Sequence, residues 1–217
     1  MDVGIIGGTG PAGRGLGLRL AAAGMSVAIG SRDPDRAAGV VEELTTVWSS
    51  RLEGTLDGVG NEVAASAKLV VLATPWEGAV QTVTALAGRL EGKVVVSMAN
   101  ALVREGREML PLVHPRGSVA AAVQVALPRS KVAAAFHHLP AREMADLDSG
   151  LIADVLVCAD DPEATTETMS LVERIDGLRP LDAGSLSQAS PIEAFTAVCI
   201  TLNIRHRAHS TLKLAGI

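Results

Sequence analysis

Short apolar runs recur along the chain, and longer segments that mix apolar with polar residues separate them. The runs at residues 3–6, 27–29 and 69–73 are brief and continuous, as expected for strands that are buried on both faces of a sheet. The intervening segments place their apolar residues at helical spacing. Strands that alternate with helices in this way predict an α/β fold with a mainly parallel, doubly wound sheet.

Capping residues predict where several helices begin. Asp33 and Asp161 each precede a proline, and we expect them to cap helices that end near residues 47 and 175. Asn61 is expected to cap a short helix through residue 67. Ser190-Pro191-Ile192-Glu193 matches a capping box with proline at the first helical position, which predicts a helix to about residue 205.

The remaining elements follow from the apolar pattern alone. We expect helices over residues 15–23, 78–90 and 118–127 and strands over 94–97, 132–136 and 154–158, with a short strand near 55–56. Gly24 is expected to end the first helix as its C′ residue. The pattern over residues 101–116 favours neither a helix nor a strand.

Composition narrows the class of function. Of the 217 residues 48% are hydrophobic, but no apolar run approaches the roughly 18 residues of a membrane span. A net charge of −5 and the absence of tyrosine argue against a nucleic-acid surface. Cys158 and Cys199 lie in apolar segments and do not have the C-x-x-C spacing of metal-binding or redox-active cysteines. The first predicted strand begins at Asp2-Val3, which leaves no room for a targeting segment before it. We therefore expect a cytoplasmic protein with no metal site, no membrane part and no nucleic-acid partner.

The first apolar run ends in a glycine cluster with a chemical meaning. Gly8, Gly10 and Gly13 have the spacing of a dinucleotide-binding turn, and they stand between a predicted strand and a predicted helix. The first glycine allows the tight turn, the second lets the backbone approach a pyrophosphate, and the third lets the helix pack on the strand. The amides at the helix N-terminus then point toward the phosphates. This turn predicts nucleotide binding.

The end of the second strand distinguishes between dinucleotides. NAD-binding turns carry an acidic residue about 20 residues after the glycines, whereas this chain has Gly30-Ser31-Arg32 there and Arg36 one helical turn later. Arginine grips phosphate oxygens in bidentate fashion, and Thr9 adds a hydroxyl from the glycine turn. A turn serine beside two solvated arginines is the alternative. The distance from the glycines favours the 2′-phosphate of NADP.

Two further loops follow predicted strands. Thr74-Pro75-Trp76 follows one, and the loop that ends at Asn100 follows the next. Open α/β sheets bind their ligands at the carboxyl ends of strands, so we expect Thr74 and Pro75 to border the nicotinamide half. A loop punctuated by proline beside a packed indole is the alternative.

These motifs together resemble a known family. The glycine turn, Gly30-Ser31-Arg32, Thr74-Pro75-Trp76-Glu77 and Phe136-His137-His138-Leu139-Pro140-Ala141 occur in this order. They are followed by Ile175-Asp176-Gly177-Leu178-Arg179-Pro180-Leu181-Asp182-Ala183-Gly184, which is far more specific than the glycines. Nearly the whole chain is similar to the NADPH-dependent reductases of the deazaflavin coenzyme F420 (F420:NADP oxidoreductases). Such an enzyme passes a hydride directly between nicotinamide and deazaflavin, without a catalytic side chain.

The resemblance implies a division of the chain and of its site residues. A Rossmann-type NADP-binding domain would span residues 1–140, and a small C-terminal part over 141–217 would complete the deazaflavin site. The residues expected at NADP are Gly8, Thr9, Gly10, Pro11, Ala12, Gly13, Ser31, Arg32, Arg36, Thr74, Pro75, Asn100 and Ala141. Those expected at the deazaflavin are His137, Leu139 and Ser210, although the tail lacks the glycine that the family has near 210–211.

Several alternatives remain open at this stage. His137 and His138 are also compatible with an ordinary loop, and the basic residues Arg179, Arg205, Arg207 and Lys213, with His206 and His209, either meet the anionic deazaflavin tail or stabilise a helix end. The helix over 190–205 is apolar nearly all round, so we expect a homodimer formed through it; packing on its own sheet is the competing account. The functional alternatives are an NADPH-dependent reductase of a flavin or another small substrate, and a redox sensor that only binds NADP.

Overall fold

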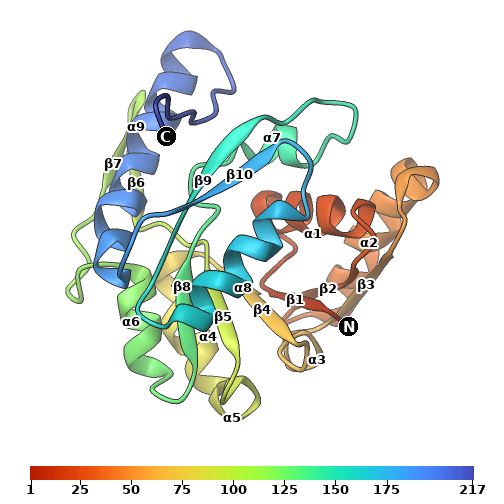
Figure 1. Cartoon of the computed structure of the whole chain (residues 1–217). Helices are drawn as coiled ribbons and strands as arrows, with labels where there is room; N and C mark the ends of the chain where they lie inside the picture. The colour runs from red at the N-terminus through yellow and green to blue at the C-terminus, as the bar shows by residue number, and fades with distance from the viewer.

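The computed structural model describes residues 1–217, and its centre is an eight-stranded sheet in the order β10-β9-β8-β5-β4-β1-β2-β3 (Figure 1). The strands are β1 (Val3–Ile6), β2 (Ser26–Ser31), β3 (Thr55–Gly60), β4 (Leu69–Leu72), β5 (Val94–Ser97), β8 (Lys131–Ala134), β9 (Ala153–Ala159) and β10 (Leu178–Asp182). Every neighbouring pair is parallel except β8 and β9, which are antiparallel. The predicted mainly parallel α/β sheet is therefore confirmed.

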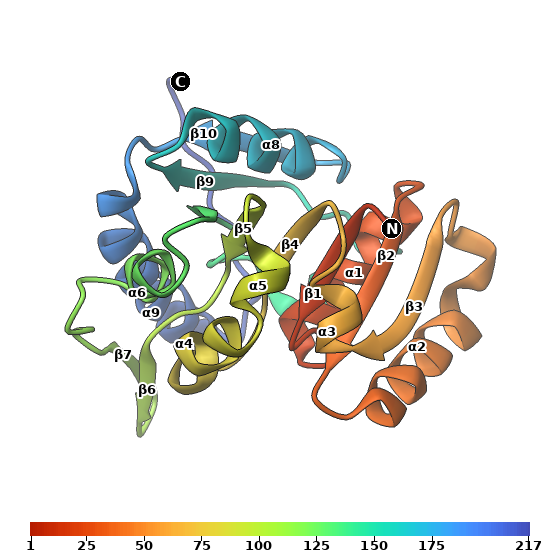
Figure 2. The ribbon, with the colours of Figure 1, turned by 90° about the horizontal axis from the view of Figure 1, so that it is seen from below.

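Helices cover both faces of this sheet. They are α1 (Pro11–Ala22), α2 (Pro34–Trp48), α3 (Asn61–Ala64), α4 (Trp76–Ala85), α5 (Ala87–Leu90), α6 (Val119–Ala126), α7 (Ala141–Met144), α8 (Pro162–Glu173) and α9 (Ala189–His206), with single turns η1 (Ser49–Arg51) and η2 (Leu186–Gln188). Figure 2 shows α8 and α6 on opposite sides of the sheet. None of the helices combines the length and apolarity that crossing a membrane requires.

Alternate residues of the buried strands supply two separate hydrophobic cores. Val3 and Ile5 face the core formed with α1, α2 and α8, whereas Ile6 faces the core formed with α4, α6 and the start of α9. A strand buried on both faces needs apolar residues at every position, which is why these strands read as continuous apolar runs.

The predicted helix starts at Asp33 and Asp161 are confirmed. The side chain of Asp33 accepts hydrogen bonds from the amides of Asp35 and Arg36, and Asp161 caps α8 in the same way. Gly24 follows α1 with φ +83°, which confirms its expected role as the C′ residue.

Three local predictions are wrong. Helix α9 begins at Ala189, directly after η2, and has no side-chain cap, so the Ser190 capping box does not form. Asn61 does not cap α3 either, because Gly60 holds that position. The helix expected over 78–90 is two helices, α4 and α5, interrupted at Leu86.

Three strands were missed in the sequence. Residues 101–116 contain an antiparallel hairpin of β6 (Leu102–Glu105) and β7 (Glu108–Pro111), which lies beside α9 (Figure 1). Local patterns do not predict this hairpin, because β7 is stabilised by a helix that is distant in the sequence. The amide of Met109 in β7 donates to Thr201 Oγ1 of α9 at 2.9 Å. Strand β10 contains Pro180, and proline within a strand is compatible with its place at the edge of the sheet.

Candidate functional site

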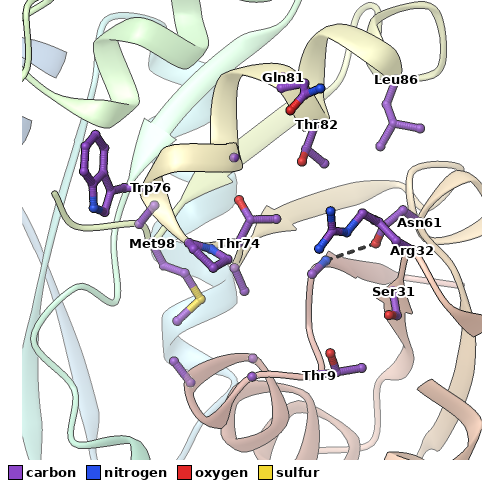
Figure 3. A pocket seen from close by; sticks show the side chains of 18 of the residues that line it. Thr9, Ser31, Arg32, Asn61, Thr74, Trp76, Gln81, Thr82, Leu86 and Met98 are labelled. Carbon is purple, nitrogen blue, oxygen red and sulfur yellow. Dashed lines mark hydrogen bonds between the residues drawn. The ribbon is translucent and has the colours of Figure 1, made fainter. Parts of the chain in front are cut away.

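A cleft of about 850 Å³ opens at the carboxyl ends of β1, β2, β4 and β5. The strand order changes direction at β1, whose chain successor β2 lies on one side while β4 lies on the other. The loops that follow β1 and β4 leave the sheet on opposite sides there, which is the usual reason for a ligand cleft in open α/β sheets. Figure 3 shows the cleft between the glycine turn, the start of α4 and the end of β2.

The glycine turn is shaped by contacts within the protein. Gly7 has φ +68°, and its amide donates to Asn61 Oδ1 at 3.1 Å (Figure 3). The amide of Gly8 donates to the carbonyl of Gly30 at 2.8 Å, which turns Gly8 away from the cleft. An added Cβ on Gly13 would lie 2.6 Å from the Cα of Gly8, so this glycine allows α1 to approach the turn.

Gly10 differs from Gly13 because no protein atom lies close to where its Cβ would be. It lines the cleft, and a Cβ placed on it would meet no protein atom within 4 Å. Nothing in the chain's own packing therefore requires glycine at this position. The open space lies at the N-terminus of α1, where unbonded amides favour an anion.

One end of the cleft carries cationic and hydroxyl groups. Thr9, Ser31 and Arg32 lie together there (Figure 3), and Arg36 also lines this end. Arg32 and Arg36 are exposed and form no ion pair. Asp33 caps α2 and Glu62 lines the cleft, but neither carboxylate forms an ion pair with the two arginines. The pair is thus free to bind a phosphate.

The other end carries amide and hydroxyl groups that lack partners. The Nδ2 of Asn100 donates to the carbonyl of His137 at 3.2 Å, which leaves its buried Oδ1 without a hydrogen bond. The Oγ1 of Thr74 is also buried and unpaired. Pro75 also lines this end, and Trp76 and Met98 complete the wall (Figure 3). Buried polar atoms without partners are costly, so a polar ligand group is expected between them.

His137 lies behind this wall, outside the cleft lining. It follows Phe136, whose φ of +65° is unusual for a residue with a side chain. Its Nδ1 donates to the carbonyl of Ala135 at 2.8 Å, and its unpaired Nε2 lies 3.9 Å from Glu193 Oε1. Burial, and secondarily His138, lower the pKa of His137 to about 3, so the ring is neutral. Leu139, Ala141 and Ser210 likewise do not line the cleft.

Glu193 has a role that the sequence did not reveal. Its carboxylate accepts the amides of Val119 at 2.9 Å and Ala120 at 3.1 Å, and so caps the N-terminus of α6 from a distant helix. Burial raises the pKa of Glu193 to about 7, although the two backbone bonds act in the opposite direction. The sequence predicts that Glu193 completes the capping box of its own helix, because the partners that it has in the fold lie more than 70 residues away.

Most of the candidate basic residues are paired within the chain. Arg179 and Lys213 both bind Asp154, a buried carboxylate, at 2.7 and 2.9 Å. The Arg179 guanidinium is the main cause that lowers the pKa of Asp154. Arg205 pairs with Glu108, His209 pairs with Glu143 at 2.9 Å, and Ser210 donates to Asn203. The C-terminal tail is therefore fastened to β9, α7 and α9.

A family model matches the first part of the chain, and two relatives and a solved structure match nearly all of it. A family model described as "NADP oxidoreductase coenzyme F420-dependent" matches residues 2–101. The chain is 36% identical to the F420-dependent NADP reductase of Methanocaldococcus jannaschii, over 97% of this chain and 96% of that one. It is 31% identical to the F420-dependent NADP reductase of Methanothermobacter thermautotrophicus, over 97% and 92%. A crystal structure of an Arthrobacter sp. FB24 protein assigned to the same activity matches with a TM-score of 0.80, 27% identity and 99% coverage of both chains.

Proposed function

Because this chain belongs to the family of F420-dependent NADP reductases, we propose that it transfers a hydride between NADP(H) and coenzyme F420. The resemblance inferred from the motifs is thus confirmed at the level of the family. The observation that carries the proposal is the cleft, which has free cations at one end and unpaired amide and hydroxyl oxygens at the other. A dinucleotide phosphate needs the first set, and a nicotinamide carboxamide needs the second.

NADP would lie with its 2′-phosphate at Ser31, Arg32 and Arg36, beside Thr9. Its pyrophosphate would lie over Gly10, Pro11, Ala12 and Gly13, all of which line the cleft. Two charge-assisted contacts from arginine favour the phosphate over a hydroxyl at the same place. Gly8 would contribute through the shape of the turn, since its amide is bonded to Gly30.

The nicotinamide would be held between Thr74, Pro75 and Asn100. Because Asn100 Nδ2 is bonded to the His137 carbonyl, the free Oδ1 is an acceptor for a carboxamide N–H. The Thr74 hydroxyl is then available as a donor to the carboxamide oxygen. These bonds would fix the rotation of the ring. The two rings supply the hydride chemistry, and the protein's part is to bring them to roughly 3–3.5 Å with water excluded.

The deazaflavin would bind against the segment that carries His137 and Leu139, with Ser210 from the C-terminal part, and Ala141 would border the nicotinamide from the start of α7. The His137 ring is buried and binds the carbonyl of Ala135, so His137 would act by shaping the loop, and its own carbonyl accepts the bond from Asn100. This assigns residues 141–217 the completion of the second binding site.

We further propose a homodimer formed through α9. Phe195, Val198 and Leu202 are 39%, 51% and 45% exposed on α9, although other residues of this helix pack on β7, η2 and α6. A row of large apolar residues left in water favours association with a second copy. Light scattering of the wild type and of Val198→Asp tests this proposal. We expect a dimeric wild type and a monomeric variant, and a monomeric wild type would refute the dimer.

The experiment for the activity is an absorbance assay. Purified protein is mixed with NADPH and oxidised coenzyme F420, and we expect the deazaflavin absorbance to bleach as the NADPH absorbance falls. The same mixture with a flavin in place of the deazaflavin, and with NADH in place of NADPH, serves as the control. Binding without bleaching would favour the redox sensor, and bleaching of the flavin alone would favour the other reductase.

A further inference from the structure

Arg19, on the helix that follows the glycine turn, binds four backbone carbonyls of a distant segment. Its Nη2 lies 2.7 Å from the carbonyl of Glu143, 2.7 Å from that of Asp146 and 2.9 Å from that of Ser149. Its Nε lies 3.2 Å from the carbonyl of Met144. One guanidinium thus holds α7 and the turn after it against α1. Hydrogen bonds from a charged donor are stronger than those between neutral groups.

A second contact shows that α1 and α7 are packed as closely as their backbones allow. A Cβ on Gly15 would lie 2.6 Å from the Cβ of Met144 and 3.0 Å from the amide of Ala145. Met144 itself is buried in the core that contains α1. The glycine at position 15 therefore lets α7 sit on α1, and Arg19 binds its carbonyls from one turn further along.

The same segment is held at its other end by the cleft wall. Asn100 Nδ2 donates to the carbonyl of His137, and the positive φ of Phe136 turns the chain out of β8 just before it. Between these two attachments lie residues 139–141, which are half-buried. Asn100 and Arg19 thus fix the two ends of one loop, from the nicotinamide side of the cleft and from the NADP-binding helix.

We propose that Arg19 is a positioning residue for hydride transfer. By binding the carbonyls of residues 143–149 it sets the place of residues 139–141 relative to the N-terminus of α1, and so the separation of the two rings. This rests on the proposed function, since it requires that the deazaflavin binds against that loop. Misplacement of a reacting group by about 1 Å costs up to about 100-fold in rate.

Two other side chains bind this segment. Arg51 pairs with Asp148 at 2.6 Å, with both side chains more than half exposed, and water and salt screen such a pair. His209 of the tail contacts Glu143, whose side chain is 19% exposed, at 2.9 Å, but this contact involves one residue of the segment. Arg19, which is partly buried and satisfies four acceptors, is the main attachment.

The experiment compares Arg19→Met, Arg19→Lys and Arg14→Met. Arg14 is the matched control, because it lies on the same helix but pairs with Glu43 of α2. We measure the dissociation constant of NADPH, the melting temperature, and the single-turnover rate of deazaflavin bleaching with both cofactors saturating. We expect Arg19→Met to lower that rate by about 10- to 100-fold with unchanged NADPH affinity. Arg19→Lys should retain part of the rate, and Arg14→Met all of it.

The proposal is overturned if Arg19→Met melts earlier but transfers hydride at the wild-type rate. It is also overturned if NADPH affinity falls in step with the rate, because Arg19 would then act on α1 alone. Should Arg19→Met not fold, Gly15→Ala displaces the same segment, and an unchanged rate in that variant refutes the proposal. A wild type that does not bleach the deazaflavin refutes the proposed function instead. Amide exchange of residues 142–150 then reports separately whether Arg19 docks the segment.

Discussion

Replacing Glu193 by glutamine is expected to change how stability depends on pH. The carboxyl is 4% exposed and caps α6 from α9. Burial raises its pKa from 4.5 to about 7, so the folded protein holds this proton more tightly than the unfolded chain does. The stability contributed by the proton is fully present below about 4.5 and is lost as the pH rises through about 7.

The size of the effect follows from the two pKa values. Each pKa unit corresponds to about 1.4 kcal/mol, so the change from 4.5 to about 7 gives about 3 kcal/mol between acidic and alkaline pH. Glutamine has the same shape but cannot ionise, so this contribution disappears. It also places an amide N–H₂ against backbone donors, which costs about 1–3 kcal/mol at every pH.

The assay is urea unfolding of the wild type and Glu193→Gln from pH 4.5 to 8.5, at one protein concentration. Groups common to both proteins cancel in the difference of the unfolding free energies. We expect the unfolding free energy of the wild type minus that of Glu193→Gln to fall by about 3 kcal/mol as the pH rises. Glu43→Gln, at an exposed carboxylate, is the control for the general effect of removing one carboxyl group. A flat curve for Glu193→Gln, or one that rises with pH, would refute the reasoning, because the two amide bonds would then outweigh burial.

Three further outcomes are expected. Arg32→Ala and Arg36→Ala should each weaken NADPH binding by roughly 10- to 100-fold and leave NADH binding unchanged, as measured by fluorescence titration. Equal losses for both cofactors would place the 2′-phosphate elsewhere. Gly13→Ala should abolish NADPH binding in calorimetry, because its Cβ would lie 2.6 Å from backbone, whereas Gly39→Ala in the open on α2 should raise the unfolding free energy by up to about 1 kcal/mol. Asn100→Ala should lower the bleaching rate more than NADPH affinity, and the reverse order would contradict its assignment to the carboxamide.

Local patterns were sufficient for the sheet apart from β10, and they singled out the residues that line one end of the cleft. Apolar runs, the caps at Asp33 and Asp161 and the glycine spacing all depend on residues within one or two turns of each other. The groups expected at the 2′-phosphate also lie close together in the chain, at the end of β2 and the start of α2. Interactions between residues that are close in the sequence form in the same way whatever the tertiary structure around them.

The tertiary structure alone decided which partner each polar group would have. Asn61 and Glu193 both stand where a local cap was predicted, yet Asn61 binds the Gly7 amide and Glu193 binds the start of α6. Arg19 reads as one more charged residue on a helix, but the fold brings four carbonyls to it.

The physical reason is that a buried polar group must be satisfied by whichever donor or acceptor the folded chain brings within reach. A sequence pattern shows that Asn61, Glu193 and Arg19 can form hydrogen bonds, and it favours the nearest partners. Packing of the helices on the sheet excludes water and presents partners from 54 to 130 residues away. The residues expected at NADP were therefore recognisable from local patterns, whereas the partner of each buried polar group was determined by the fold.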